Sequence, residues 1–393
     1  MSRSNRLLFF FLAWVGMIFY FMQRWIFGPL IPSLMTTFNA DKTTLGVVGA
    51  ASLWGYMFTP IPAGFLSDRF GRKHVILTGI FGFSALTALC GLATSSGQLF
   101  AGRFFTGMVE AAYFIPLLAF TLELFPERPG FFLTFMTSGS SLGWFIGPAL
   151  AGWLLDVTGS WRVPFLATGC AGLVVAFLLL MYWPKQEKAL KRGTLLDRNL
   201  LKSSSLIMLL FLALTATFQI SAEFGFNMWY PVFLRTELLT SATVAGITTG
   251  LWGAGQCIGR PILGLAADRM GYRKVGVAGG VMMTVALMLI LSAHNPYFCG
   301  LFTFLGGFIS ASVMGSLWTF TGLVFPSSKG LALGIITTFA YATASLGPIS
   351  IGYIGDHYSL GTALWAVCVP CAFLAACMFL ATVFLKKGPT LDS

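Results

Sequence analysis

Four charged residues stand inside long apolar stretches of this sequence, where a charge is costly. Arg24 lies in the first stretch, Arg103 and Glu110 in the fourth, and Glu223 in the seventh. A charge inside a membrane span costs about 2.5–3.5 kcal/mol on insertion scales, so such residues are functional candidates by default. Arginine keeps its charge and presents a planar donor fork that suits a carboxylate, whereas glutamate can gain or lose a proton. The set predicts a site for an organic anion and a proton.

Arg103 and Glu110 are seven residues apart, which places them on nearly the same helix face about two turns apart. We expect Arg24 and Arg103 to bind substrate, and Glu110 and Glu223 to couple protons. In this hypothesis, protonation of Glu110 releases Arg103 to bind the anion, so proton and substrate favour each other's binding reciprocally. Two alternatives stay open. In the first, Arg103 and Glu110 form an ion pair with a structural role only. In the second, Arg24 is an outer-gate or snorkelling residue.

The seventh stretch carries a polar stripe, because Gln219, Glu223 and Asn227 follow the i, i+4, i+8 spacing of one helix face. We expect Gln219 and Asn227 to line a substrate cavity, with interhelical hydrogen bonding as the alternative. Tyr113 and Tyr341 are candidate cavity walls that would contact substrate, and packing is the alternative for each.

The amino-acid composition indicates that these residues are held by membrane-spanning helices. Of 393 residues, 56% are hydrophobic and only 9% are charged, whereas a soluble domain is roughly 25% charged. This excludes a soluble enzyme and a nucleic-acid binder, and it makes the lipid bilayer the surrounding medium. Each apolar stretch has the roughly 20 residues that a membrane-spanning helix needs. Twelve such stretches lie near 7–32, 44–66, 75–95, 98–122, 131–154, 163–183, 206–233, 241–265, 275–293, 297–324, 330–354 and 361–385.

Basic residues predict the orientation. Most Lys and Arg fall on one side of the predicted spans, and only Lys42, Arg162 and Arg235 fall on the other. This bias predicts that both termini are cytoplasmic. The short loops fit a multi-pass protein of a bacterial inner (plasma) membrane and a monomer. We expect no cofactor, and the three histidines are too far apart in the sequence to predict a metal site.

The sequence contains an internal repeat at an offset of 200 residues. The segment from Gly64 to Lys73 is echoed from Gly264, and Phe125-Pro126 by Phe325-Pro326. Gly147-Pro148 and Asp156 likewise match residues 347–348 and 356. Three unrelated patterns at one offset indicate repeated units. We predict an N-terminal six-helix bundle over 1–184, a cytoplasmic linker over 185–204 and a C-terminal bundle over 205–393. Substrate would bind between the two halves.

The loop that follows the second span matches the pattern G-x-x-x-D-R-x-G-R-[RK] in full, and its second copy departs only at Tyr272. In this the chain resembles the major facilitator superfamily. The resemblance implies an all-α membrane protein with 12 transmembrane helices in two pseudo-symmetric six-helix bundles. It also implies a latch that locks the cytoplasmic side of the outward-open state, with Glu123 as ion-pair partner of the loop arginines. Its expected members are Gly64, Asp68, Arg69, Gly71, Arg72, Glu123, Asp268 and Arg269. Arg260, with Pro261 and Gly264, is similar to part of the second-half latch.

The run from Arg103 to Ala111 resembles the R-x-x-x-G-x-x-E-A pattern of the anion:cation symporter branch, which also has an arginine at the position of Arg24. The resemblance implies a secondary transporter, not an enzyme, that moves a small organic anion by alternating access with proton symport. Gln23 departs from the pattern, because several proton-coupled members carry an acid there. This departure leaves the number of coupled protons open.

Two other functions remain as alternatives. The run from Gly143 to Gly152 is close to a pattern of drug:proton antiporters, and spinster-type lipid carriers share the glutamate of the fourth span. Both similarities favour a proton-coupled exporter of drugs or amphipathic lipids. A non-transporting receptor or scaffold on the same fold is the third possibility.

Overall fold

The structure, a computed structural model, describes residues 3–184, 203–325 and 329–385. These residues form helices joined by short turns, and no strand occurs among them. The helices are α1 Arg3–Trp25, α2 Phe27–Phe38, α3 Lys42–Met57, α4 Pro60–Phe70, α5 Arg72–Cys90, α6 Ser96–Leu124, α7 Pro129–Thr158, α8 Arg162–Met181, α9 Ser203–Thr236, α10 Ala242–Met270, α11 Tyr272–Ser292, α12 Pro296–Val324, α13 Lys329–Ala344, α14 Leu346–His357 and α15 Leu360–Phe384. The expected all-α fold is confirmed.

Three of the predicted spans are broken into two helices each. The first breaks at Ile26, the second around Thr59, and the eleventh at Ser345. The second break has a clear cause, because Pro60 opens α4 and proline has no backbone N–H to donate to the preceding turn. In the described part of the chain, nine helices or joined helix pairs are long and apolar enough to cross a membrane. The pair α3–α4, α7 and α10 are not among them.

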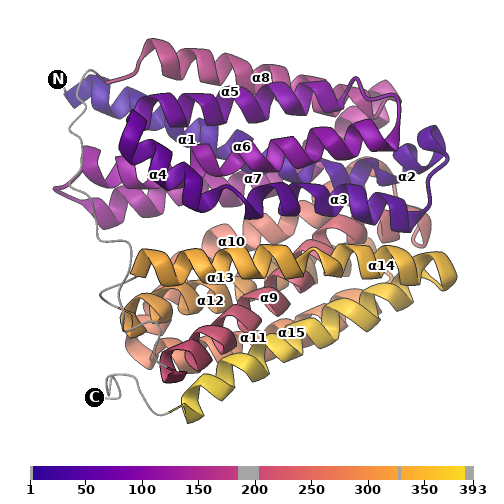
Figure 1. Cartoon of the computed structure of the whole chain (residues 1–393). Coiled ribbons are helices and arrows are strands. Elements are labelled where there is room, and N and C mark those ends of the chain that lie inside the picture. The colour runs from indigo at the N-terminus through magenta and orange to yellow at the C-terminus, as the bar shows by residue number, and fades with distance from the viewer. Residues whose placement is uncertain (1–2, 185–202, 326–328, 386–393) are drawn as a thin grey trace.

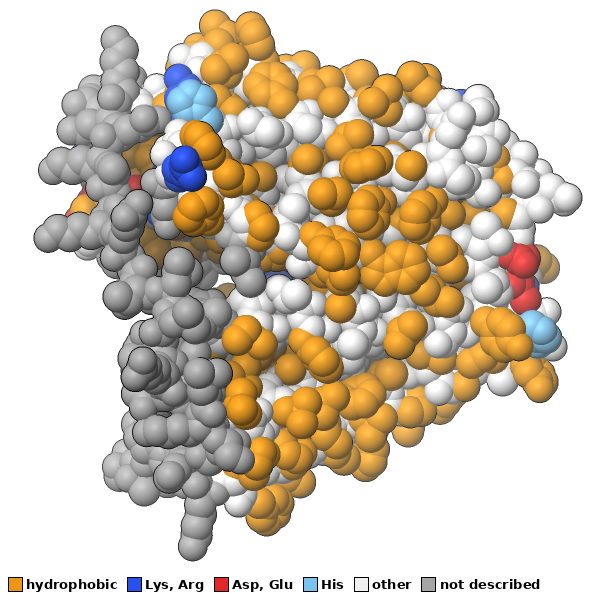
Figure 2. Space-filling model, viewed as in Figure 1, with side chains coloured by type: hydrophobic (Ala, Val, Ile, Leu, Met, Phe, Trp, Pro, Cys, Tyr) orange, Lys and Arg blue, Asp and Glu red, His pale blue; other side chains and the backbone are white. Residues whose placement is uncertain are grey.

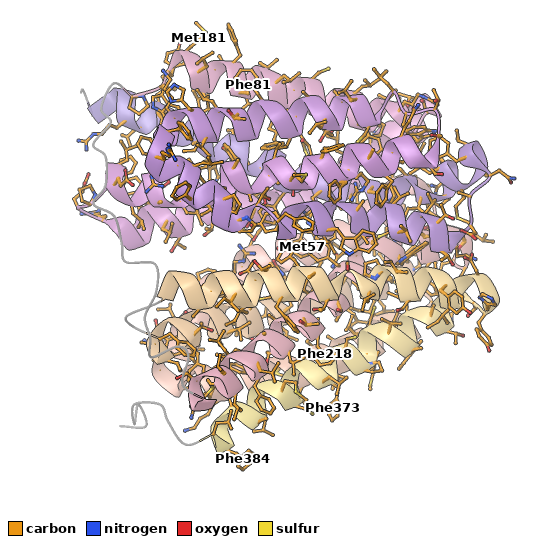
Figure 3. The ribbon with its side chains drawn as sticks, viewed as in Figure 1. Met57, Phe81, Met181, Phe218, Phe373 and Phe384 are labelled. Atoms are coloured by element: carbon orange, nitrogen blue, oxygen red, sulfur yellow. The ribbon has the colours of Figure 1, made fainter. Side chains whose placement is uncertain are left out.

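The helices form two groups, with α1–α8 above α9–α15 in Figure 1 and both chain ends on one side. Apolar side chains cover the middle of the face shown in Figure 2, and most described charges there lie near its two ends. Met181 and Phe384 project outward from opposite sides of the molecule in Figure 3, with exposed fractions of 63% and 79%. Such side chains face lipid in a membrane protein. Met57 lies between the two groups (Figure 3).

Glycines at equivalent positions of the two halves allow equivalent close helix contacts. A Cβ on Gly55 would lie 1.9 Å from the carbonyl oxygen of Phe104, where α3 packs on α6. A Cβ on Gly255 would lie 2.0 Å from that of Phe304, where α10 packs on α12. Small residues let helix backbones approach closely in membranes. The sequence repeat therefore has a counterpart in packing.

Two aspartates at the end of the molecule that holds α2 and α14 join the halves. Asp156, near the end of α7, accepts hydrogen bonds from the first two backbone N–H groups of α10, at 3.2 and 2.7 Å. Asp356, on α14, accepts from the first two N–H groups of α3, at 3.0 and 2.8 Å. A carboxylate at a helix N-terminus satisfies orphan donors and interacts favourably with the helix dipole. We call these two contacts the aspartate clamps.

Candidate functional site

A cavity of about 2530 Å³ lies between the two groups of helices. Its walls come from both halves, with Arg24, Tyr56 and Trp144 on one side and Glu223 and Tyr341 on the other. It extends away from the aspartate clamps to the ends of α4 and α10, where its lining includes Gly64, Arg69, Gly264 and Asp268. We call this the loop end, because the chain turns there at Gly71 and Gly271. The cavity is therefore closed at the clamp end and reaches the loop end.

Arg24 and Glu110 form a buried ion pair that joins α1 to α6. Arg24 Nη2 donates to Glu110 Oε2, and the two side chains are only 2% and 1% exposed. Arg24 also lines the cavity. From the sequence we expected Arg103 to be the partner of Glu110, but Arg24 takes this place in the structure. The cavity arginine is thus neutralised by a group that can take up a proton.

Aromatic rings surround the Arg24 guanidinium. Its central carbon lies 5.2 Å from the ring centre of Tyr56, 5.6 Å from Tyr20, 5.8 Å from Phe224 and 5.9 Å from Tyr341. Tyr56 and Tyr341 belong to different halves, and their ring centres are 4.8 Å apart. Cation–π contacts of this kind hold a guanidinium in place. Tyr56, Phe224 and Tyr341 also line the cavity, so they present an aromatic surface next to the guanidinium.

Two stacked tryptophans form part of the cavity wall where α1, α7 and α9 meet. The rings of Trp25 and Trp144 are 4.3 Å apart and nearly parallel. Trp144 Nε1 donates to Asn227 Oδ1 at 3.2 Å, and Asn227 Nδ2 donates to the carbonyl of Glu223. Asn227 is 2% exposed and lies behind Trp144 instead of lining the cavity. Its position supports the interhelical alternative of the sequence analysis.

Glu223 lies in a network of neutral polar groups on the opposite wall. Its Oε1 accepts from Gln219 Nε2 at 3.1 Å and from Gln256 Nε2 at 3.4 Å. Gln256 Nε2 also donates to Ser310 Oγ at 3.1 Å. Glu223 and Gln256 line the cavity, whereas Gln219 is fully buried behind them. Gln219 therefore supports Glu223 in this structure and has no access to the cavity.

Arg260 also lines the cavity, although the sequence analysis placed it in the latch. Its Nη2 donates to Gln256 Oε1 at 3.1 Å, and its Nη1 donates across to α7, to Ser140 Oγ at 2.8 Å and the Thr137 carbonyl at 3.3 Å. The i, i+4 pair of Gln256 and Arg260 in one apolar stretch is the sequence signal that could have identified this group.

Arg103 does not line the main cavity. Its guanidinium donates to the carbonyls of Val48 and Gly49 and to Ser52 Oγ on α3, and it lies 4.2 Å from the ring centre of Phe27. It lines instead a separate cavity of about 10 Å³ on the other side of the Arg24–Glu110 pair. The hydrogen-bond donors of Arg103 are thus occupied by α3, whose backbone carbonyls lie opposite this position of α6.

Tyr113, the other expected substrate-binding residue on α6, is fully buried outside the cavity. Its hydroxyl donates to the carbonyl of Ala13 at 2.8 Å, and its ring packs near Phe83. A Cβ on Gly16 would lie 2.2 Å from that hydroxyl, so glycine makes the room for it. Tyr113 therefore joins α6 to α1 in this structure.

The residues of the expected latch occupy the loop end. Gly71 and Gly271 turn the chain with φ of 89° and 94°, a region that favours glycine. Arg72 Nε donates to Glu123 Oε1 at 3.1 Å, so a loop arginine does pair with Glu123. In the second copy, Tyr272 donates its hydroxyl to Asp268. Arg69 and Arg269 are exposed; the Asp68 side chain lies outside the described part of the structure.

A cavity between two repeated helix bundles, closed at one end and lined by buried charges, defines a multi-pass membrane transporter. The sequence profile of the Major Facilitator Superfamily matches residues 13–238 and 212–392. The chain belongs to this family.

Relatives of known activity align along almost the whole chain. The cis,cis-muconate transport protein of Acinetobacter baylyi is 26% identical over 90% of this chain and 88% of its own. The 4-hydroxybenzoate transporter PcaK of the same organism is 24% identical over 92% of this chain and 88% of its own. A bacterial homologue of the human lysosomal transporter Spinster, in an inward-facing and occupied conformation, superposes with a TM-score of 0.80. That pair shares 15% identity over 99% of this chain and 100% of the other, which shows the fold.

Proposed function

We propose that this protein carries a small organic acid across the membrane by proton-coupled symport. The observation that carries the proposal is the cavity-lining Arg24, paired with Glu110 and surrounded by aromatic rings. A guanidinium recognises a carboxylate through paired, charge-assisted hydrogen bonds. The rings of Tyr56 and Tyr341 give an aromatic surface for the body of the acid, and the relatives that transport muconate and 4-hydroxybenzoate support this class of substrate.

Coupling follows from competition for Arg24. When Glu110 is ionised, it occupies the guanidinium and the cavity has no free cation there. A proton on Glu110 neutralises the carboxylate, which frees Arg24 to bind the substrate carboxylate. Proton and anion then favour each other's binding by the same factor. This replaces the Arg103–Glu110 competition expected from the sequence, and Arg103 and Tyr113 are left out of the binding set.

Glu223 is the second proposed proton-coupling residue. It lines the opposite wall, and its contacts to Gln219 and Gln256 are to neutral amides. A proton on Glu223 would leave these contacts largely in place, because a protonated carboxyl still accepts hydrogen bonds. We propose one substrate-linked proton at Glu110 and an auxiliary proton at Glu223.

The conformational cycle uses the two ends of the molecule. With the loop end in the cytoplasm, the present conformation is inward-open and the aspartate clamps close the outer side. In the outward-open state the clamps separate and the latch of Asp68, Arg69, Arg72 and Glu123 locks the cytoplasmic side. In this topology both termini lie on the cytoplasmic side of a bacterial inner membrane, and residues 185–204 link the two bundles of a monomer.

The proposal is tested by uptake into proteoliposomes. We expect purified protein to take up labelled 4-hydroxybenzoate or cis,cis-muconate when the outside is acidic, and we expect the uptake to saturate. Glu110→Gln mimics the protonated state, so it should lose pH-driven accumulation and keep substrate exchange between two equal pools. Glu127→Gln, an exposed loop acid, is the matched control and should behave as wild type.

Two outcomes would contradict the proposal. Accumulation by Glu110→Gln against a substrate gradient would remove the coupling role of that residue. Efflux of hydrophobic dyes that ignores Arg24, with no acid uptake, would identify a drug or lipid exporter instead.

A further inference from the structure

Arg260 is a second cationic group in the transport cavity, and its charge balance differs from that of Arg24. Arg24 has a carboxylate in direct contact. The bonds of Arg260 go to an amide oxygen, a hydroxyl and a backbone carbonyl, all of them neutral. Among the described residues, no acid lies within ion-pair distance of Arg260. Glu223 acts on it from further away, and the two groups share Gln256 as a hydrogen-bond partner. A charge held inside the membrane is normally paired, so Arg260 lacks the direct counter-ion that Arg24 has.

Unused hydrogen-bonding groups line the same cavity. The Ser141 hydroxyl is fully buried, lines the cavity and follows Ser140, the residue that Arg260 contacts. Ser316, on the C-terminal wall, is 2% exposed and also lines the cavity. Within the described part of the chain, neither hydroxyl has a hydrogen-bond partner. Buried polar groups are rarely left unpaired in native proteins, so each hydroxyl has a hydrogen bond to offer to a ligand or water.

The geometry points to a second anion subsite at Arg260, on the wall that faces Arg24. We propose that the cavity selects acids with two anionic groups, one carboxylate bound by Arg24 and the other by Arg260 and the Ser141 hydroxyl. Gln256 positions Arg260, because its amide oxygen accepts from the guanidinium while its nitrogen is held by Ser310. A dicarboxylate would then bridge the two halves of the protein. This inference rests on the proposed function, since it uses the same cavity.

The experiment compares two acids that differ by one carboxylate, benzoate and benzene-1,4-dicarboxylate. Wild-type protein in proteoliposomes should prefer the diacid. Arg260→Gln should raise the KM for the diacid at least about tenfold, the equivalent of one charge-assisted hydrogen bond, and should leave the KM for benzoate within about twofold. Arg260→Lys should keep part of the preference, because it retains the charge and loses the planar fork.

Two controls separate binding from structure. Ser140→Ala removes one of the two bonds from Arg260 to α7 and keeps the Arg260 charge, so its ratio of the two KM values should match wild type. Arg162→Gln changes an arginine outside the cavity and should leave both KM values unchanged. An equal change in both KM values by Arg260→Gln would overturn the subsite. Uptake of either acid that survives Arg24→Gln, or the absence of all acid uptake, would overturn the proposed function and this inference together.

Discussion

The two walls of the cavity come from repeated helices and carry different chemistry. On the N-terminal wall, Arg24 and Glu110 are in direct contact and aromatic rings surround the cation. On the C-terminal wall, Glu223 and Arg260 are linked through the amide of Gln256 and are not in contact. On the first wall one proton on Glu110 would break a direct ion pair, whereas on the second wall Glu223 acts on Arg260 only from beyond ion-pair distance.

The same backbone positions support both arrangements. At the offset of 200 residues, Phe224 takes the place of Arg24, Ser310 that of Glu110, and Gln256 that of Tyr56. The glycine contacts of α3 on α6 and of α10 on α12 are retained. The repeat therefore fixes the scaffold, and individual substitutions decide which half holds the proton-linked anion site.

The largest difference between the walls should appear when one charge is removed from each. Arg24→Met leaves Glu110 buried without its partner, so we expect loss of uptake and a fall in stability of about 3–5 kcal/mol. Glu223→Gln retains an oxygen that accepts from Gln219 and Gln256, so stability should change by less than about 1 kcal/mol. Thermal unfolding in detergent measures both. Equal destabilisation would mean that the walls do not differ as described.

The scaffold, in contrast, should respond alike in both halves. Gly55→Ala and Gly255→Ala each place a methyl group within 2.0 Å of a backbone oxygen, and we expect each to cost about 1–3 kcal/mol. Gly264→Ala is the matched control on α10, because nothing lies within 4 Å of a Cβ there. The same thermal assay measures both variants. If only one of the two lost stability, the glycine contacts of the two halves would not be equivalent.

The aspartate clamps should differ slightly in strength. Asp156→Ala and Asp356→Ala each remove a helix N-terminal contact worth about 1 kcal/mol, which corresponds to roughly a fivefold shift toward the outward-open state. The shift should be larger for Asp356, whose carboxylate also lies 3.6 Å from Lys42 Nζ. Labelling of single cysteines at the clamp end measures the population. No increase in labelling for either variant would show that the clamps do not hold this end closed.

The smallest effect is expected at Tyr113. Tyr113→Phe removes one hydrogen bond to Ala13, which should cost about 0.5–1.5 kcal/mol of stability. The KM for substrate should not change, because the ring lies outside the cavity. A several-fold rise in KM with normal stability would show instead that Tyr113 contacts the substrate.

The sequence by itself determined the membrane class, the helical fold and the repeat, because long apolar stretches and a fixed offset do not depend on packing. It also identified Arg24, Glu110 and Glu223 as charges inside the spans. The structure buries all three, with Arg24 and Glu223 lining the cavity. Only the tertiary structure decided that Glu110 pairs with Arg24 and that Arg260 belongs to the cavity. Helix periodicity gives the face of a residue on its own helix, whereas its partners depend on which neighbour lies opposite at that level. Arg103 meets the backbone carbonyls of α3 there, and this alone removes it from the cavity.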